Sequence, residues 1–169
     1  KKFLAEQDLN AETRYIPPVV IASSRLEKWA QKIAIIGSGP AGLSAAYYLA
    51  TKGYKPTVFE KSRKPGGMLT YGIPSFKLEK NIIDAEIQVI RELGVEIRCG
   101  VEVGKDVTIQ QLRDQGFEAF YIAIGCQGGR RPGVANDEAL GTSIAVEFLH
   151  KALEDEHQTM EGNVVVVGG

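Results

Sequence analysis

The stretch IAIIGSGPAGLSAAYYLA, residues 33–50, contains no charged residue and constrains the fold more than any other part of the chain. A membrane-spanning helix needs about 20 apolar residues in one run. Here three glycines, Ser38 and Pro40 interrupt the apolar run, and a proline in mid-segment would break a spanning helix. We therefore interpret the stretch as a buried strand, a glycine-rich turn and a helix.

Gly37, Gly39 and Gly42 form the pattern G-x-G-x-x-G between the expected strand at 32–36 and the expected helix at 40–52. Gly37 permits a tight turn, Gly39 lets the backbone approach a pyrophosphate, and Gly42 lets the helix pack on the strand. The free N–H groups and the positive dipole end of the helix would face the phosphates. The pattern predicts a dinucleotide-binding turn.

Glu60 supports this prediction. It ends the next expected strand, at 56–60, and follows Gly37 at about the 20-residue spacing of an acid that binds the adenosine ribose. Its carboxylate can accept hydrogen bonds from ribose hydroxyls and would repel a 2′-phosphate, which disfavours NADP at this site. The alternative is a glycine turn with an incidental glutamate. The glycine motif alone does not separate FAD from NAD.

Strand and helix patterns alternate along the rest of the chain. The further elements that we expect are a helix at 78–93, short strands at 95–98 and 101–103, a short helix opened by a capping box of Thr108 and Gln111, a strand at 118–124, a helix at 142–156 and a final strand at 163–169. This alternation predicts an α/β fold, with a Rossmann-like, doubly wound, mainly parallel sheet and helices on both faces.

Composition narrows the function classes. The chain has 20 basic and 21 acidic residues, which gives no electrostatic argument for nucleic acid or an anionic membrane as a partner. Cys99 and Cys126 are too far apart for a CxxC motif and suit buried intracellular thiols, and the polar opening KKFLAEQDLN lacks a signal-peptide core, so we expect a cytoplasmic protein. His150 and His157 suit solvated positions at the last helix, so no metal site is predicted.

No set of catalytic acid, base or nucleophile is visible, which suits an enzyme whose cofactor carries the redox chemistry. The motifs GSGPAG, FEK, GGMLTYGIPSFKLEK, CGVEVGKDVT and YIAIG together resemble the FAD-binding region of the small (beta) subunit of bacterial glutamate synthase. Related flavin regions occur in dihydropyrimidine dehydrogenase. The resemblance is strong over residues 32–126, and it implies an NAD(P)H-dependent flavin oxidoreductase with FAD as the cofactor.

The resemblance also implies which residues contact FAD. These are Gly37, Ser38, Gly39, Pro40, Ala41 and Gly42 along the pyrophosphate, Glu60 and Lys61 at the adenosine ribose, Gly67 and Met68 near the flavin's phosphate and ribityl chain, Lys77 at a phosphate, Val103 at adenine through its backbone, and Gly125 where backbone approaches the cofactor. Taken without the resemblance, Lys77 is a solvated lysine in a loop and Met68 is a core residue.

The chain ends in VVVVGG, an apolar run into glycines like that at 33–37. We expect residues 161–169 to begin a second dinucleotide domain, which binds NADPH in the resembling enzymes; the alternative is a strand that simply ends. Residues 1–31 would form an N-terminal helix and a linker, extended at 15–20, and residues 32–160 an incomplete FAD domain. The resemblance also implies that an iron–sulfur domain or a large subunit is a partner of this region.

Two other functions stay open. One is a module that binds NAD or an adenine nucleotide without catalysis, and the other is a structural half that folds only with a missing partner segment. As an oxidoreductase, the whole protein would pass electrons from NAD(P)H through FAD to a further centre. We expect the 169 residues alone to have little or no such activity.

Overall fold

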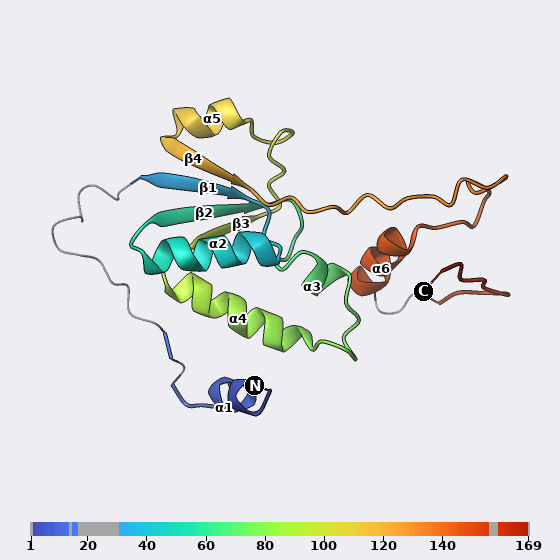
Figure 1. Cartoon of the computed structure of the whole chain (residues 1–169), viewed down its shortest axis with the longest axis horizontal. Helices are drawn as coiled ribbons and strands as arrows, with labels where there is room; N and C mark the ends of the chain where they lie inside the picture. The colour runs from blue at the N-terminus through green and yellow to red at the C-terminus, as the bar shows by residue number, and fades with distance from the viewer. Residues whose placement is uncertain (1, 14, 17–30, 156–158, 169) are drawn as a thin grey trace.

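The computed structural model describes residues 2–13, 15–16, 31–155 and 159–168. Its centre is a four-stranded sheet with the strand order β3-β2-β1-β4 (Figure 1). The strands are β1 (Lys32–Ile36), β2 (Lys55–Glu60), β3 (Glu96–Cys99) and β4 (Phe117–Ile122), and every neighbouring pair is parallel. The predicted Rossmann-like parallel sheet is confirmed.

Helices connect and flank these strands. They are α1 (Lys2–Leu9), α2 (Pro40–Thr51), α3 (Met68–Tyr71), α4 (Lys80–Glu92), α5 (Ile109–Asp114) and α6 (Ala145–Glu154). The predicted capping box opens α5, because Thr108 Oγ1 accepts a hydrogen bond from the Gln111 N–H (3.1 Å) and Gln111 Oε1 accepts one from the Thr108 N–H (2.8 Å). Thr108 thereby fixes where the chain turns back toward β4.

Side chains on the two faces of the sheet enter two separate cores, as the alternation of a strand requires. Ile35 and Val58 pack with the apolar sides of α2 and α4. Ala34 and Phe59 point to the other face, where Leu112 of α5 covers them. Figure 1 shows α2 and α4 together on one side of the sheet and α5 beside β4 on the other. The expected helices on both faces are present.

Four elements differ from the sequence prediction. The expected strand at 101–103 is reduced to one isolated bridge between Val103 and Val107. Helix α3 lies where we expected only a loop. Helix α6 begins at Ala145 rather than at Thr142. Thr142 belongs to the preceding turn, since its backbone N–H donates to the Ala139 carbonyl (3.0 Å) and its hydroxyl lies 2.8 Å from the same oxygen. The last difference concerns the C-terminal valines.

No strand forms over the described part of the C-terminal segment, residues 159–168. Val165, Val166 and Val167 are 83–85% exposed and pair with none of the described strands. A strand needs a neighbour to satisfy its backbone groups, so the apolar pattern alone does not produce one. The proposed boundary at 161 stays a prediction, and Gly169 lies outside the described residues.

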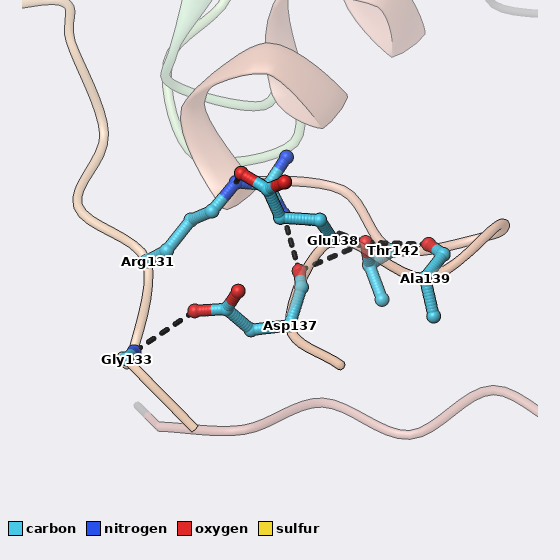
Figure 2. A network of polar contacts seen from close by, with 6 residues as sticks. All are labelled: Arg131, Gly133, Asp137, Glu138, Ala139 and Thr142. Carbon is cyan, nitrogen blue, oxygen red and sulfur yellow. Dashed lines mark hydrogen bonds and ion pairs between the residues drawn. The ribbon is translucent and has the colours of Figure 1, made fainter. Parts of the chain in front are cut away.

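The connection from β4 to α6 folds back on itself, as Figure 2 shows. The Gly133 N–H donates to Asp137 Oδ2 (2.9 Å), and Arg131 Nη1 contacts the Asp137 carbonyl. Arg131 Nε also lies 3.9 Å from Glu138 Oε1. These local contacts hold the turn that precedes α6.

Parts of the N-terminal prediction fall outside the described residues. Of the expected linker at 15–20, the structure describes only Tyr15 and Ile16. His157 also lies outside them. Among the residues that are described, no helix has the length and apolar character needed to cross a bilayer.

Candidate dinucleotide-binding site

The first glycine turn lies at the carboxyl end of β1, between β2 and β4. Gly37 has φ +102°, its N–H donates to the Phe59 carbonyl (2.8 Å), and an added Cβ would lie 2.4 Å from the Ala123 carbonyl oxygen. An added Cβ at Gly42 would lie 2.0 Å from the Gly37 carbonyl oxygen. Both positions therefore need glycine for the fold itself, one for the turn and one for the contact between α2 and β1.

Gly39 is different, because no contact with the residues that the structure describes requires glycine there. It is the N-cap of α2 with φ −69°, which any residue adopts, and an added Cβ would meet no atom within 4 Å. It provides no side-chain cap for the helix. The first N–H groups of α2, at Ala41 and Gly42, have no partner within the helix. The space beside Gly39 is open, so a phosphate could approach these N–H groups at the start of α2.

Hydrogen bonds from the glycine turn fix the side chain of Glu60. Ser38 donates to Glu60 Oε2 twice, from its backbone N–H (2.9 Å) and from its hydroxyl (2.6 Å). The Ser62 N–H donates to Glu60 Oε1 (2.8 Å). Ser38 is fully buried and Glu60 is 5% exposed, so the carboxylate is fixed at the end of β2.

The charge of Glu60 results from opposing effects. Burial raises the pKa of the Glu60 carboxyl, but the hydrogen bonds from Ser38 and Ser62 outweigh it and leave that pKa below its ordinary value of 4.5. The acid is therefore ionised at neutral pH. Ser38 and Ser62 each contribute a backbone and a side-chain hydrogen bond to this carboxylate.

A second glycine turn, Gly66–Gly67, closes over the first. The Gly66 N–H donates to the Ser38 carbonyl (3.0 Å) and lies 3.2 Å from the Ser38 hydroxyl oxygen. Gly67 has φ +55°, and an added Cβ would lie 2.8 Å from the Gly39 Cα. The backbones of the two turns are thus in contact. A phosphate held at Gly39 would lie next to Gly67.

Helix α3 continues from this second turn. Its first residue, Met68, is 38% exposed. The Tyr71 hydroxyl accepts from the Lys64 N–H (2.8 Å), and Tyr71 stacks on His150 of α6 with ring centroids 4.5 Å apart. We expected His150 to be solvated, and this expectation is wrong, because its ring is half-buried against Tyr71 of α3.

The structure brings most of the predicted contact residues to one edge of the sheet. Gly37 to Gly42, Glu60 and Gly67 are joined by the contacts above. The segment that contains Val103 begins beside Glu60, since the Val101 N–H donates to the Glu60 carbonyl (2.9 Å). Gly125, with φ +68°, follows Ala123, whose N–H donates to the Ile36 carbonyl (2.8 Å).

Two predicted residues are not brought in by any described contact. Lys61 is exposed beyond the end of β2, and Lys77 is exposed between α3 and α4, with no hydrogen bond or ion pair of its ammonium among the described residues. Sequence reasoning missed Ser62, Gly66 and Tyr71. The adjacent glycines at 66–67 were a visible signal of a second turn, whereas nothing in the sequence pointed to the long-range bonds that hold it.

The described residues contain no group of three or more His, Cys, Asp or Glu that could hold a metal ion. The described residues instead offer the free N–H groups at the N-terminus of α2, the open backbone at Gly39 and the fixed carboxylate of Glu60. Strands β2 and β3 lie on one side of β1, and β4 lies on the other. The glycine turn is therefore at the topological switch point of the sheet. Fold and site define a dinucleotide-binding α/β domain.

The family follows from comparison with known proteins. A family model described as pyridine nucleotide-disulphide oxidoreductase matches residues 31–169, and the chain belongs to this family. Subunit beta of the NADP(+)-dependent formate dehydrogenase of Moorella thermoacetica is 49% identical over 142 residues, which are 82% of this chain and 20% of that subunit.

Two further relatives bear out the predicted resemblance. The glutamate synthase [NADPH] small chain of Escherichia coli K12 is 35% identical over 157 residues, 86% of this chain and 33% of that protein. The PreT subunit of NAD-dependent dihydropyrimidine dehydrogenase from the same strain is 39% identical over 139 residues, 82% of this chain and 33% of that subunit. The chain spans at most a third of each of these three relatives.

Solved structures show the same fold. Mycobacterium tuberculosis FprA in complex with NADPH matches with a TM-score of 0.62 at 24% identity, over 72% of this chain and 28% of that one. A 2-naphthoyl-CoA reductase complex matches with a TM-score of 0.62 at 22% identity, over 72% of this chain and 18% of that one. The Rossmann-like arrangement is thus shared with much longer chains.

Proposed function

We propose that this chain is the FAD-binding part of an NAD(P)H-dependent oxidoreductase similar to the glutamate synthase small chain. The observation that carries the proposal is the open backbone at Gly39, the N-cap of α2, next to the buried Glu60 that Ser38 holds. Membership of the pyridine nucleotide-disulphide oxidoreductase family supports it. So does the motif GIPSFKLEK, which an ordinary NAD domain does not need in this connection.

The residues present fit a dinucleotide with two phosphates and a ribose. The N–H groups at Ala41 and Gly42 would bind the pyrophosphate, and the α2 dipole would favour its negative charge. Glu60 would accept a hydrogen bond from a ribose hydroxyl. The backbone at Gly67 and Met68 would lie along the next part of the cofactor, Val103 would present backbone to adenine, and Gly125 would let the β4 connection approach.

Bound FAD would supply the redox chemistry, accepting a hydride from NAD(P)H and passing electrons on. The role of this chain would be to bind and orient FAD. Its Glu60 carboxylate would place a fixed negative charge at the ribose. Lys77 would contribute a cation to a phosphate, and Lys61 would lie beside Glu60. The nicotinamide site, an iron–sulfur domain or a large subunit would belong to the rest of the protein.

The site can be tested with one glycine substitution and a matched control. Gly39→Val puts a side chain into the open space beside Gly39, and Gly128→Val puts the same side chain where an added Cβ also meets nothing within 4 Å and φ is not positive. Each protein is incubated with FAD, desalted and measured by visible absorption. We expect a flavin spectrum in the unaltered protein and in Gly128→Val, and its loss in Gly39→Val.

The alternative is a module that binds NAD or an adenine nucleotide without catalysis. The same open backbone at Gly39 supports it, because a pyrophosphate is common to both ligands. Tight binding of NAD by the unaltered protein, without uptake of FAD, would favour this alternative over a flavoprotein. A flavin spectrum that survives in Gly39→Val would contradict a site at this turn for either ligand.

A further inference from the structure

Lys80 occupies a position that its own helix does not favour. It is the first residue of α4, and α4 has no acidic residue in its first turn and no side-chain cap at Glu79. A cation at the N-terminus of a helix is opposed by the helix dipole. Interactions with residues outside α4 can offset this unfavourable effect of the dipole.

Those interactions come from α3. The Lys80 ammonium donates to the Leu69 carbonyl (2.9 Å) and also contacts the Ile73 carbonyl. Leu69 lies within α3, where the last carbonyls of a helix lack partners inside it, and Ile73 lies just after the C-cap Gly72. The side chain is half-buried, so these bonds are only partly exposed to competing water.

Helix α3 needs such support because it has only four residues. A single helical turn is unstable alone, since its first hydrogen bond fixes several residues at once. Its amides bond back into the second glycine turn: the Thr70 N–H donates to the Gly67 carbonyl (3.0 Å), and the Leu69 N–H donates to the Gly66 carbonyl (3.2 Å). Anything that holds α3 therefore also holds the Gly66–Gly67 turn against Gly39.

We propose that Lys80 is a positioning residue for the nucleotide site, whose ammonium holds α3 and thereby sets the second glycine turn over the first. This inference rests on the proposed FAD function, because an effect on FAD binding requires that the Gly66–Gly67 turn borders the FAD site. Lys80 does not touch the open space beside Gly39 itself. It acts through the carbonyls of Leu69 and Ile73.

Lys77 provides the matched control. It lies three positions earlier in the same connection, and its ammonium has no hydrogen bond or ion pair with any residue that the structure describes. Lys77→Met and Lys80→Met remove the same charge from the same region. Lys80→Arg keeps a cation with several donors and tests whether the function returns with the hydrogen bonds.

The first measurement is amide hydrogen exchange in the ligand-free protein. We expect the amides of residues 69–73 to exchange about tenfold faster in Lys80→Met, the equivalent of one charge-assisted hydrogen bond, and to return toward the original rate in Lys80→Arg. Lys77→Met should leave these rates unchanged. Unchanged exchange in Lys80→Met, in a sample that denaturant titration shows to be folded, would overturn the proposal.

The second measurement is FAD affinity, followed by flavin fluorescence at several salt concentrations. Lys80→Met should bind FAD about tenfold more weakly with an unchanged salt dependence, because no contact with a phosphate is lost. Lys77→Met, if it removes a phosphate contact, should reduce the salt dependence instead. Full FAD affinity in Lys80→Met despite faster exchange would overturn the positioning role.

The two proposals can fail separately. If the unaltered protein takes up no FAD, the proposed function is contradicted, while the exchange rates of the same samples still decide whether Lys80 holds α3. If Lys80→Met does not fold, the Lys80→Arg variant is used to test whether the hydrogen bonds of Lys80 hold α3. Original exchange and affinity in the arginine variant support the hydrogen bonds as the cause, and faster exchange with weaker binding there counts against them.

Discussion

The Ser38 hydroxyl lies 2.6 Å from Oε2 of Glu60 and donates a hydrogen bond to a carboxylate that is 5% exposed. The two residues come from different strand ends, one after β1 and the other at the end of β2. The same hydroxyl oxygen lies 3.2 Å from the Gly66 N–H. Ser38 therefore joins three parts of the site through its own hydrogen bonds.

Replacing Ser38 by alanine should lower the free energy of unfolding by about 2 kcal/mol at pH 7, the usual range for a hydrogen bond to a charged group. The Glu60 carboxylate would stay buried with one donor fewer. Ser44→Ala, at an exposed position of α2, serves as the control and should have little effect. Urea unfolding of the three proteins measures the difference, and equal losses in both variants would rule out this role for the Ser38 hydroxyl.

The stability contributed by Glu60 should depend on pH in a defined direction. Its pKa in the folded protein lies below its ordinary value of 4.5. The contribution is therefore fully present above about pH 4.5 and is lost as the pH falls through the lower folded-state value. Urea unfolding of the protein and of Glu60→Gln should show a difference at pH 7 that shrinks toward pH 3. A constant difference would mean that the carboxylate charge is not involved.

Gly42→Ala should destabilise the protein, although alanine in a helix interior is normally better than glycine by about 1 kcal/mol. The added Cβ would lie 2.0 Å from the Gly37 carbonyl oxygen, so α2 must move away from β1. We expect a loss of about 1–3 kcal/mol in denaturant titration, as is typical of overpacking. An increase in stability would show that α2 is not packed this closely on the turn.

His150→Ala should loosen α6 from α3. The imidazole stacks on Tyr71 with ring centroids 4.5 Å apart and an interplanar angle of 19°. Loss of such a ring pair typically lowers stability by about 0.5–1.5 kcal/mol, in addition to the loss from the apolar area that is no longer buried. Amide exchange of α6 should become faster in His150→Ala and stay near the original rate in His150→Phe, which keeps a ring. Equal exchange in both variants would contradict a role for the stack.

The two cysteines should react at different rates with an aromatic disulfide reagent. Burial raises the pKa of the Cys99 thiol, and the negative charge of Glu60 raises it further. Cys126 is exposed. Because the thiolate is the reactive form, Cys99 should react more slowly than Cys126 at pH 8. Cys126→Ser should abolish the fast phase and Cys99→Ser the slow one; the reverse assignment would contradict this environment for Cys99.

Much of the fold could be predicted because its signals are local. The apolar run that leads into Gly37, the glycine spacing and the acid at Glu60 each lie within one connected segment. Parallel-strand topology then places these pieces at a single sheet edge without further information. The roles of Gly37 and Gly42 in the turn could be derived from the motif alone for the same reason.

The missed features depend on contacts between distant segments. Helix α3 lies in a glycine- and proline-rich segment whose local preference is a loop, and bonds from Lys80 and the Lys64 backbone hold it in place. The C-terminal valines show the opposite case, where a strong strand pattern meets no neighbouring strand among the described residues. Local pattern predicts an element only where the tertiary partners agree with it.

The contact between the two glycine turns has a consequence for the energetics of binding. The Gly66 N–H is bonded to Ser38, and Gly67 lies against Gly39, so contacts within the protein itself hold the two turns together. Folding has therefore already restricted the backbone on both sides of the open space beside Gly39. Because these contacts do not need a ligand, less of the binding free energy of a nucleotide entering there would go into ordering the two turns.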